Sequence, residues 1–422
     1  MPFRFIHTAD LHLDSPLRSL SLRNPDLAGL IGDSTRRALV SIVDLALEEQ
    51  IDAVIIAGDL YDGDQTSMKT ARFLAAQLGR LDAAGIATYV IRGNHDALSR
   101  ITQELILPPS VKLYSGRAEI VESSREGLRI AVQGMSFAKP HAPESLLPKF
   151  RPPVADAVNI GILHTSLAGA VGHDVYAPCS AADLHAAGFD YWALGHIHQR
   201  MDHPGSRTVI MPGMPQGRDI NEAGPKTVSL VTIRDDRTIA VEERLTSLAE
   251  FARVPVDLTP ATTWFEAVET IEAALVAARG TTASEHLVSR LVLTGTTPLA
   301  FRIRRDRDLL LTEAEARAEG IGRTWIEKLE LSMQPPGETG SVASADPLVE
   351  LGSLMRSDMA ASHGLREDVR RMVKELRDDL PAESRGFSGD DEAEFEAFVA
   401  QLLADGSDDV MARLKAESAE TH

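Results

Sequence analysis

The sequence predicts an α/β fold with two packed sheets, then a small α+β domain and a helical C-terminal region. The first 200 residues alternate short apolar runs with amphipathic stretches, which is typical of βαβ units around a largely parallel sheet. From Leu128 to Ile233 the apolar runs are separated mostly by loops, which favours a second, mixed sheet packed on the first. At roughly 150 residues per domain, a chain of 422 residues is expected to form two or three domains.

The first sheet is predicted from the first 92 residues. Residues 34–50 carry one apolar face at helical spacing, and Ser34 is a suitable N-cap. The run at 53–57 is apolar throughout, as expected for a strand buried on both faces. In chain order we predict a strand at 3–8, a helix at 34–50, a strand at 53–57, a helix at 67–84 closed by Gly85, and a strand at 87–92.

Later elements follow the same reasoning. Five further strands are predicted at 128–134, 158–163, 190–194, 209–211 and 227–233. A second unit begins near Phe251, with helices predicted at 264–279 and 312–318 and strands at 287–294 and 324–331. We therefore divide the chain into a core at 1–245, a capping domain at 250–335, a Pro/Gly/Ser-rich linker at 336–347, and a helical partner-binding region at 348–422.

Composition narrows the class of protein. The chain has 43 basic and 62 acidic residues, a formal charge of −19, so bulk charge does not favour coating nucleic acid. The single cysteine, Cys179, excludes an intrachain disulfide and a cysteine-rich metal site. The sequence has neither a signal-peptide pattern nor an apolar run of about 18 residues. We expect a cytoplasmic protein with no membrane partner.

Metal-binding residue types follow five of the predicted strands. The carboxyl ends of strands in open α/β sheets are where ligands collect, so these residues are expected to meet. They are Asp10 and His12 after 3–8, Asp59 after 53–57, Asn94, His95 and Asp96 after 87–92, His164 after 158–163, and His196 and His198 after 190–194.

The spacing within these motifs suits a pair of metal ions. Residues i and i+2 of an extended segment point the same way, so Asp10 and His12 can chelate together, as can His196 and His198. Mixed carboxylate, imidazole and amide ligands suit Mn²⁺, Fe or Zn²⁺. A dinuclear site of this kind serves displacement at phosphoesters, because it generates hydroxide at neutral pH and neutralises phosphoryl oxygens.

Taken together, these motifs resemble the calcineurin-like metallophosphoesterases. The resemblance is carried by Asp10-x-His12, Gly58-Asp59-x-x-Asp62, Gly93-Asn94-His95-Asp96, His164 and Gly195-His196-x-His198. The blocks around them are similar to SbcD-type DNA repair exonucleases. Gly172-His173-Asp174 and Pro215-Gln216-Gly217-Arg218 are similar to the YhaO-like branch. The resemblance covers about residues 1–235 and is faint from 250 to 335.

The resemblance implies an αββα two-sheet metallophosphoesterase sandwich, a cap that shapes DNA access, and two divalent ions, with Mn²⁺ expected. It places one ion on Asp10, His12, Asp59 and His198, and the other on Asp59, Asn94, His164 and His196. It makes His95 the acid or transition-state stabiliser, oriented by Asp96. From the sequence alone, Asp62 is expected to stabilise a turn and His7 to be a core or supporting histidine.

A basic run at 302–307 adds a candidate contact to substrate. Arg304 and Arg305 could bind phosphate within the cap, and a solvated basic strand face is the alternative.

The leading functional hypothesis is a metal-dependent DNA nuclease, an exonuclease with endonuclease activity left open, that acts in DNA repair. DNA and an SMC-like coiled-coil ATPase are the expected partners, and a homodimer stays open. One alternative is a phosphatase or small phosphodiesterase on the same core. Another is a mainly structural or regulatory subunit of an ATPase complex.

Overall fold

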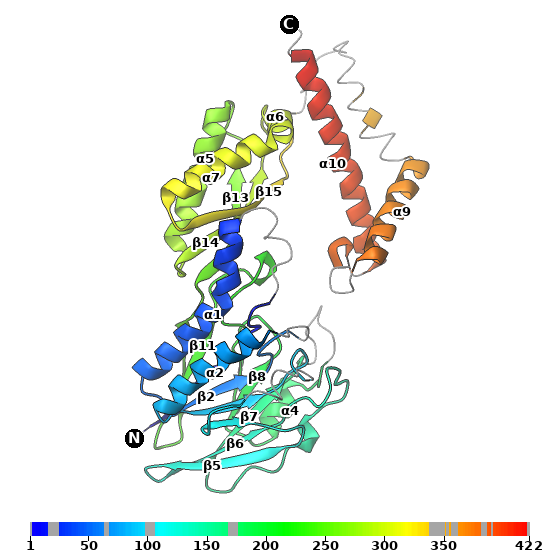
Figure 1. Ribbon diagram of the computed structural model, residues 1–422. Coiled ribbons are helices and arrows are strands. Elements are labelled where there is room, and N and C mark those ends of the chain that lie inside the picture. Colours follow the sequence, from blue (N-terminus) through cyan, green and yellow to red (C-terminus); the bar gives the residue numbers. More distant parts are fainter. Residues whose placement is uncertain are drawn as a thin grey trace. The chain divides into compact units, whose positions relative to one another are not determined.

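Two six-stranded sheets form the N-terminal part of the computed structural model (Figure 1). Their strand orders are β12-β11-β1-β2-β3-β4 and β5-β6-β7-β8-β10-β9. The structure describes residues 2–15, 25–62, 67–97, 106–167, 176–336, 351, 354–355, 362–380, 386–389 and 391–419.

The first sheet is parallel at its centre. Its parallel strands are β1 (Phe3–Thr8), β2 (Ala53–Ala57), β3 (Ala87–Ile91) and β4 (Val111–Leu113). On the other side of β1, β11 (Thr227–Ile233) and β12 (Ile239–Leu245) pair in antiparallel fashion. The carboxyl ends of β1, β2 and β3 therefore share one edge of the sheet.

The second sheet is mixed. Its parallel strands are β6 (Leu128–Gly134), β7 (Val158–His164), β8 (Tyr191–Gly195) and β10 (Thr208–Met211). At its two edges, β5 (Glu119–Arg125) is antiparallel to β6, and β9 (Met201–His203) is antiparallel to β10.

The period-2 alternation of strand side chains builds the layers. In β2, Val54 and Ile56 pack with helices α1 (Pro25–Glu48) and α2 (Met68–Ala83), whereas Ile55 packs with the second sheet. On the far side of the second sheet, Trp192 and Leu194 pack with Leu184 of α4 (Ala181–Ala186). The predicted αββα sandwich is thus the observed architecture.

The rest of the chain adds a three-stranded sheet and helices. The sheet has the order β13 (Ala249–Asp257), β14 (His286–Thr294), β15 (Thr324–Leu331). Its neighbours in sequence are α5 (Trp264–Thr281), α6 (Ala300–Arg305) and α7 (Arg307–Ile321), followed by α9 (His363–Asp379) and α10 (Glu392–Ala419). Of the predicted linker at 336–347, all but residue 336 lies outside the described residues.

The chain divides into two compact units, and the division runs through the three-stranded sheet. The first unit contains residues 1–253, 278–289 and 323–327, and the second contains the remainder. The physical reason is a small core in which Leu27 and Ile31 of α1 pack with Phe251 of β13 and Val288 of β14. One end of the three-stranded sheet therefore belongs with the two-sheet unit.

The start of the first helix corrects the sequence prediction. Helix α1 begins at Pro25, nine residues before the expected start at Ser34. Pro25 has the fixed φ that suits a first helical position, and Leu27 and Ile31 extend the apolar stripe N-terminally. Ser34 is buried within the helix, where its hydroxyl donates to the Ile31 carbonyl at 2.7 Å.

The basic run at 302–307 also differs from its prediction. It was considered as a strand face, but residues 302–305 lie in α6 and Arg307 begins α7. The edge strands β5 and β12 were missed, because their exposed residues lack the apolar alternation that identifies a half-buried strand.

Candidate metal centre

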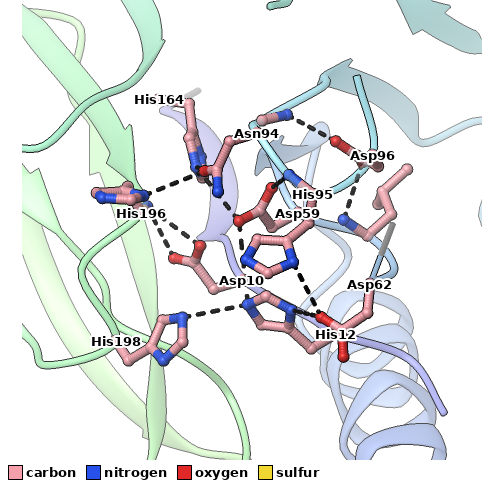
Figure 2. Close-up of polar contacts among 12 residues, drawn as sticks. Asp10, His12, Asp59, Asp62, Asn94, His95, Asp96, His164, His196 and His198 are labelled. Atoms are coloured by element: carbon pink, nitrogen blue, oxygen red, sulfur yellow. Dashed lines mark hydrogen bonds and ion pairs between the residues drawn. The ribbon is translucent and has the colours of Figure 1, made fainter. Parts of the chain in front are cut away.

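The candidate ligands lie at the ends of strands, or in the loops that leave them, at one edge of the sandwich. The loops after β1 and β2 run side by side, since the Asp10 N–H donates to the Gly58 carbonyl at 3.0 Å and the His12 N–H donates to the Asp59 carbonyl at 3.1 Å. Loops from β3, β7 and β8 bring the remaining ligands to the same place (Figure 2). The structure therefore brings all seven predicted metal ligands together.

Several of these residues occupy a strained backbone region. Asp10, His12, Asp59 and His196 have φ values of 52°, 42°, 52° and 105°, in the region that favours glycine. Each such residue costs on the order of 1–3 kcal/mol and persists only where the surrounding structure imposes it. The strain coincides with the turns that direct these side chains inward.

The first cluster consists of Asp10, His12 and His198, whose ligand atoms all lie within 4.8 Å of one another. His12 Nε2 is 3.1 Å from His198 Nε2 and 4.0 Å from Asp59 Oδ2. The buried Asp10 carboxylate accepts a hydrogen bond from the His196 N–H at 3.0 Å. Three of the four residues predicted for one ion therefore lie together, and the fourth, Asp59, lies 4.0 Å from His12.

The second cluster consists of Asp59, His164 and His196, also within 4.8 Å. His164 Nε2 lies 3.3 Å from Asp59 Oδ2 and 2.9 Å from Asn94 Oδ1, which is 3.2 Å from His196 Nδ1. These are the residues predicted for the other ion. Asp59 is the carboxylate that lies between the two clusters.

Two glycines leave the space that these side chains fill. A Cβ at Gly93 would lie 2.3 Å from Asp59 Oδ1, and a Cβ at Gly58 would lie 2.4 Å from His164 Nδ1. Gly58 also has a φ of 100°. The strand ends are therefore shaped around the ligand side chains.

The electrostatics of the centre favour a bound cation. Burial opposes the charged form of His164, but the carboxylates of Asp59 and Asp10 outweigh burial and raise its pKa to about 9. Burial alone would raise the pKa of Asp59, yet His164 and His12 beside it lower that pKa well below its usual range. A divalent ion fits this site because it supplies the positive charge that protonated imidazoles otherwise supply.

His164 is oriented for this role by the backbone. Its Nδ1 donates to the carbonyl of Ala57 at 2.9 Å, which leaves Nε2 directed at Asp59 and Asn94. Fixing the tautomer through the other ring nitrogen is the usual arrangement of a metal-binding histidine.

Asp62 is the carboxylate that contacts His95. Its Oδ1 is 3.3 Å from His95 Nδ1 and 2.6 Å from His12 Nδ1, and its Oδ2 accepts from the Ser15 hydroxyl (Figure 2). Asp62, which was expected to stabilise a turn, therefore also contacts the candidate ligand His12 and the His95 ring. His12, Asp62 and His95 form a third group of ligand-type atoms within 4.8 Å.

Asp96 holds loops in place. It is fully buried and accepts from the Leu60 N–H at 3.0 Å and the Gly93 N–H at 2.7 Å. The prediction that Asp96 orients His95 is corrected by these contacts. Its carboxylate fixes the loops after β2 and β3, on which Asp59 and Asn94 lie.

His7 is a core histidine, as expected. Its Nδ1 accepts from the Tyr191 hydroxyl and its Nε2 donates to the Leu194 carbonyl, both at 2.9 Å. Burial lowers the pKa of His7 to about 3, so the ring stays neutral. His173, which supported the resemblance to the YhaO-like branch, lies outside the described residues.

The two candidate substrate-binding arginines are engaged by carboxylates. The side chain of Arg304 is only 9% exposed and forms ion pairs with Asp408 at 3.2 Å and with Asp405 and Asp409 at 3.6 Å, all on α10. Arg305 pairs with Asp306 at 2.7 Å. In the structure, the charge of both arginines is therefore directed at protein carboxylates.

Reasoning from the spacing of ligand motifs did not identify Arg218 and Glu222 as residues of the site. Glu222 Oε1 accepts from His198 Nδ1 at 2.8 Å and from Arg218 Nη2 at 2.7 Å. Neither residue follows a strand in a ligand pattern, and only the fold shows that they support His198.

Two families match the chain. Residues 3–200 match the calcineurin-like phosphoesterases, and residues 251–334 match the middle domain of the metallophosphoesterase YhaO.

Among the residues that the structure describes, no helix has the length and apolar character needed to cross a membrane.

Curated relatives agree with these matches. The chain is 36% identical to "Uncharacterized metallophosphoesterase YhaO" of Bacillus subtilis over 70% of this chain and 72% of that protein. It is 26% identical to "DNA double-strand break repair protein Mre11" of Sulfurisphaera tokodaii over 50% of this chain and 54% of that protein, so it spans about half the length of that relative. It is 25% identical to the Mre11 protein of Halobacterium salinarum over 89% of this chain and 95% of that protein.

Replacing the shared carboxylate tests the dinuclear arrangement. We expect Asp59→Asn to lose both ions, because a neutral amide bridges two cations poorly. Metal content per folded chain is the measurement, with circular dichroism to verify the fold. Two ions per chain in Asp59→Asn would contradict the assignment.

Replacing His95 separates chemistry from metal binding. We expect His95→Ala to keep its fold and both ions but to lose about 10²–10⁴-fold in rate, the usual contribution of one acid–base group. His203→Ala, which removes a half-buried histidine of β9, is the control and should leave the rate unchanged. Full turnover by His95→Ala would assign His95 to packing.

Proposed function

Because this chain belongs to the YhaO-like family of calcineurin-like phosphoesterases, we propose that it is a metal-dependent DNA nuclease that acts in DNA repair. The observation that carries the proposal is the pair of adjacent ligand clusters, in which Asp59 of the second cluster lies 4.0 Å from His12 of the first. The relatives named as DNA double-strand break repair proteins support DNA as the substrate. The site itself supports phosphoester hydrolysis in general.

The expected cofactor is a pair of divalent ions, and we propose Mn²⁺. Asp10, His12, Asp59 and His198 would hold one ion, and Asp59, Asn94, His164 and His196 would hold the other. When bound, such ions supply a nucleophilic hydroxide and neutralise the phosphoryl oxygens. The mixture of oxygen and imidazole nitrogen donors suits Mn²⁺, Fe or Zn²⁺, and the family resemblance leads us to choose Mn²⁺.

His95 is proposed to donate the proton that the departing oxygen needs. Its side chain is 43% exposed, so substrate can reach it, whereas the ligand histidines His12 and His164 are buried. With Nδ1 directed at Asp62, the other ring nitrogen, Nε2, would deliver the proton. Asp62 holds the ring orientation during that transfer.

The net charge of −19 requires a source of positive potential for DNA. Two divalent ions would add +4 at the centre. Arg304 and Arg305 are engaged by Asp405, Asp408, Asp409 and Asp306, so they offer little free charge. We therefore propose that an SMC-like ATPase supplies most of the remaining DNA-binding surface.

The C-terminal helices are proposed to dock this ATPase. Val373 of α9 packs with Phe395, Val399 and Leu403 of α10, so the two helices form their own small core. Met372 and Leu376, one turn apart on α9, are more than half exposed and offer an apolar strip to a partner helix.

A nuclease assay tests the proposed function directly. We expect purified protein with Mn²⁺ to degrade end-labelled DNA, to gain activity when the ATPase is added, and to lose all activity on chelation. The Asp59→Asn variant is the control for contaminating nucleases. Hydrolysis of a small phosphomonoester without any DNA cleavage would instead show a phosphatase. Two bound ions with no hydrolysis of any ester would show a structural subunit.

Charge placed on the α9 strip tests the docking surface. We expect Met372→Glu combined with Leu376→Glu to abolish co-purification with the ATPase, because the charges would have to be desolvated in the interface. Basal nuclease activity should be unchanged. Phe265→Glu, at an apolar position of α5 with the same 61% exposure as Met372, is the matched control. Undiminished association of the double variant would refute this surface.

A further inference from the structure

Arg218 lies between two carboxylates of the metal centre. On one side, its Nη2 donates to Glu222 Oε1 at 2.7 Å and its Nε donates to Glu222 Oε2 at 3.2 Å. On the other side, its Nη1 lies 3.8 Å from Asp62 Oδ2 and donates to the Ser15 hydroxyl at 3.2 Å. One guanidinium therefore joins Glu222 to Asp62.

Each of these carboxylates holds a candidate metal ligand. Glu222 accepts from His198 Nδ1 at 2.8 Å, and Asp62 accepts from His12 Nδ1 at 2.6 Å. His12 and His198 belong to the same cluster, with Asp10. A continuous chain of charged contacts thus runs from His198 through Glu222, Arg218 and Asp62 to His12.

The second cluster is supported differently. His164 directs Nδ1 to the backbone carbonyl of Ala57, and the Asp59 carboxylate accepts from the His95 N–H at 3.0 Å. The contacts of Arg218 described above involve none of the residues of this second cluster. Arg218 is therefore connected to one side of the centre only.

The loop that carries Arg218 is rigidly held. Gln216 is buried, and its side chain donates to the Ala249 carbonyl at 2.8 Å and accepts from the Leu248 N–H at 2.8 Å. Glu222 Oε2 also accepts from the Arg218 N–H at 2.8 Å. Arg218 is thus held by its own backbone N–H and by the hydrogen bonds of Gln216 to the start of β13, so it is pre-organised for its contacts.

The charge of Arg218 is directed mainly at protein groups. Three of its five N–H groups donate to Glu222 and Ser15, and the two carboxylates flanking it carry more negative charge than it carries positive. An arginine in this setting has little potential left to attract a substrate phosphate. Its contacts fit a residue that fixes the geometry of its neighbours.

We propose that Arg218 is the positioning residue of the Asp10–His12–His198 metal site. It fixes the separation of Glu222 and Asp62 and, through them, the orientations of His198 and His12. The inference rests on the proposed dinuclear phosphoesterase function, and it specifies which ion depends on which supporting residue. A planar, permanently charged fork suits this role, since a lysine cannot hold both carboxylates in the same geometry.

The test is a calorimetric titration of Mn²⁺ into metal-free Arg218→Gln. We expect one of the two sites to weaken by about 10–100-fold, the usual effect of losing a supporting contact, while the other site keeps its affinity. Arg218→Lys should weaken the same site less, because it keeps the charge but not the fork. Thermal melting of each variant checks that the fold is retained.

Arg200→Gln is the matched control. Arg200 is similarly buried, with 17% of its side chain exposed against 21% for Arg218, and it also pairs with two carboxylates, Asp202 and Glu243. We expect both Mn²⁺ sites to be unchanged in this variant. An equal loss at Arg200→Gln and Arg218→Gln would assign Arg218 to general stability and overturn the inference.

Kinetics on a small chromogenic diester give the second readout. Loss of positioning should lower kcat and leave KM nearly unchanged, and a raised KM with both ions intact would show a phosphate-binding arginine instead. Equal weakening of both Mn²⁺ sites would also overturn the inference. Wild-type protein could bind two ions and cleave no DNA, while Arg218→Gln selectively weakens one of the two sites. In that case the DNA nuclease proposal fails and the positioning role stands.

Discussion

The candidate metal ligands come from both sheets, and the two sheets meet at the backbone carbonyl of Ala57, the last residue of β2. His164 at the end of β7 donates to this carbonyl at 2.9 Å, and a Cβ at Gly195, the last residue of β8, would lie 2.1 Å from it. Because Gly195 has no side chain, β8 can approach β2 closely enough for His196 and His198 to reach Asp10 and Asp59. A larger residue there would separate the sheets at the edge where the ligands converge.

The contacts around the ligands complete this arrangement through charge. His164 is directed by a backbone carbonyl, whereas His12 and His198 are directed by Asp62 and Glu222. The guanidinium of Arg218 pairs with the half-buried carboxylates of both Asp62 and Glu222, and its charge offsets their mutual repulsion. The centre is therefore asymmetric. A backbone carbonyl orients His164, whereas the ion-paired side chains of Asp62, Arg218 and Glu222 orient His12 and His198.

Local sequence pattern was enough to predict where the candidate ligands lie and most of the sheets. The strands at 3–8 and 53–57 have buried residues nearly throughout, and a residue that follows such a strand has a defined position, so Asp10 and Asp59 could be placed before the structure was known. Contacts between distant loops could not be predicted in this way. Asp62 and Asp96 both follow ligand motifs, and only the fold shows that Asp62 contacts His95 while Asp96 binds backbone amides.

Arg218 and Glu222 illustrate the same limit, since their role depends on a loop folding back onto His198 across 24 residues. Arg304 illustrates the opposite case. A cluster of arginines indicated a phosphate contact, but Arg304 forms ion pairs with three aspartates of α10, about 100 residues later in the chain. Charge in a sequence indicates an interaction, and tertiary structure decides whether protein or substrate provides the partner.

Anomalous diffraction at the manganese edge from crystals soaked in Mn²⁺ tests the central claim most directly. The account predicts two peaks roughly 3.5–4 Å apart, one on each side of Asp59, the first near His12 and His198 and the second near His164 and His196. A single peak, or a peak enclosed by His12, Asp62 and His95, would contradict it.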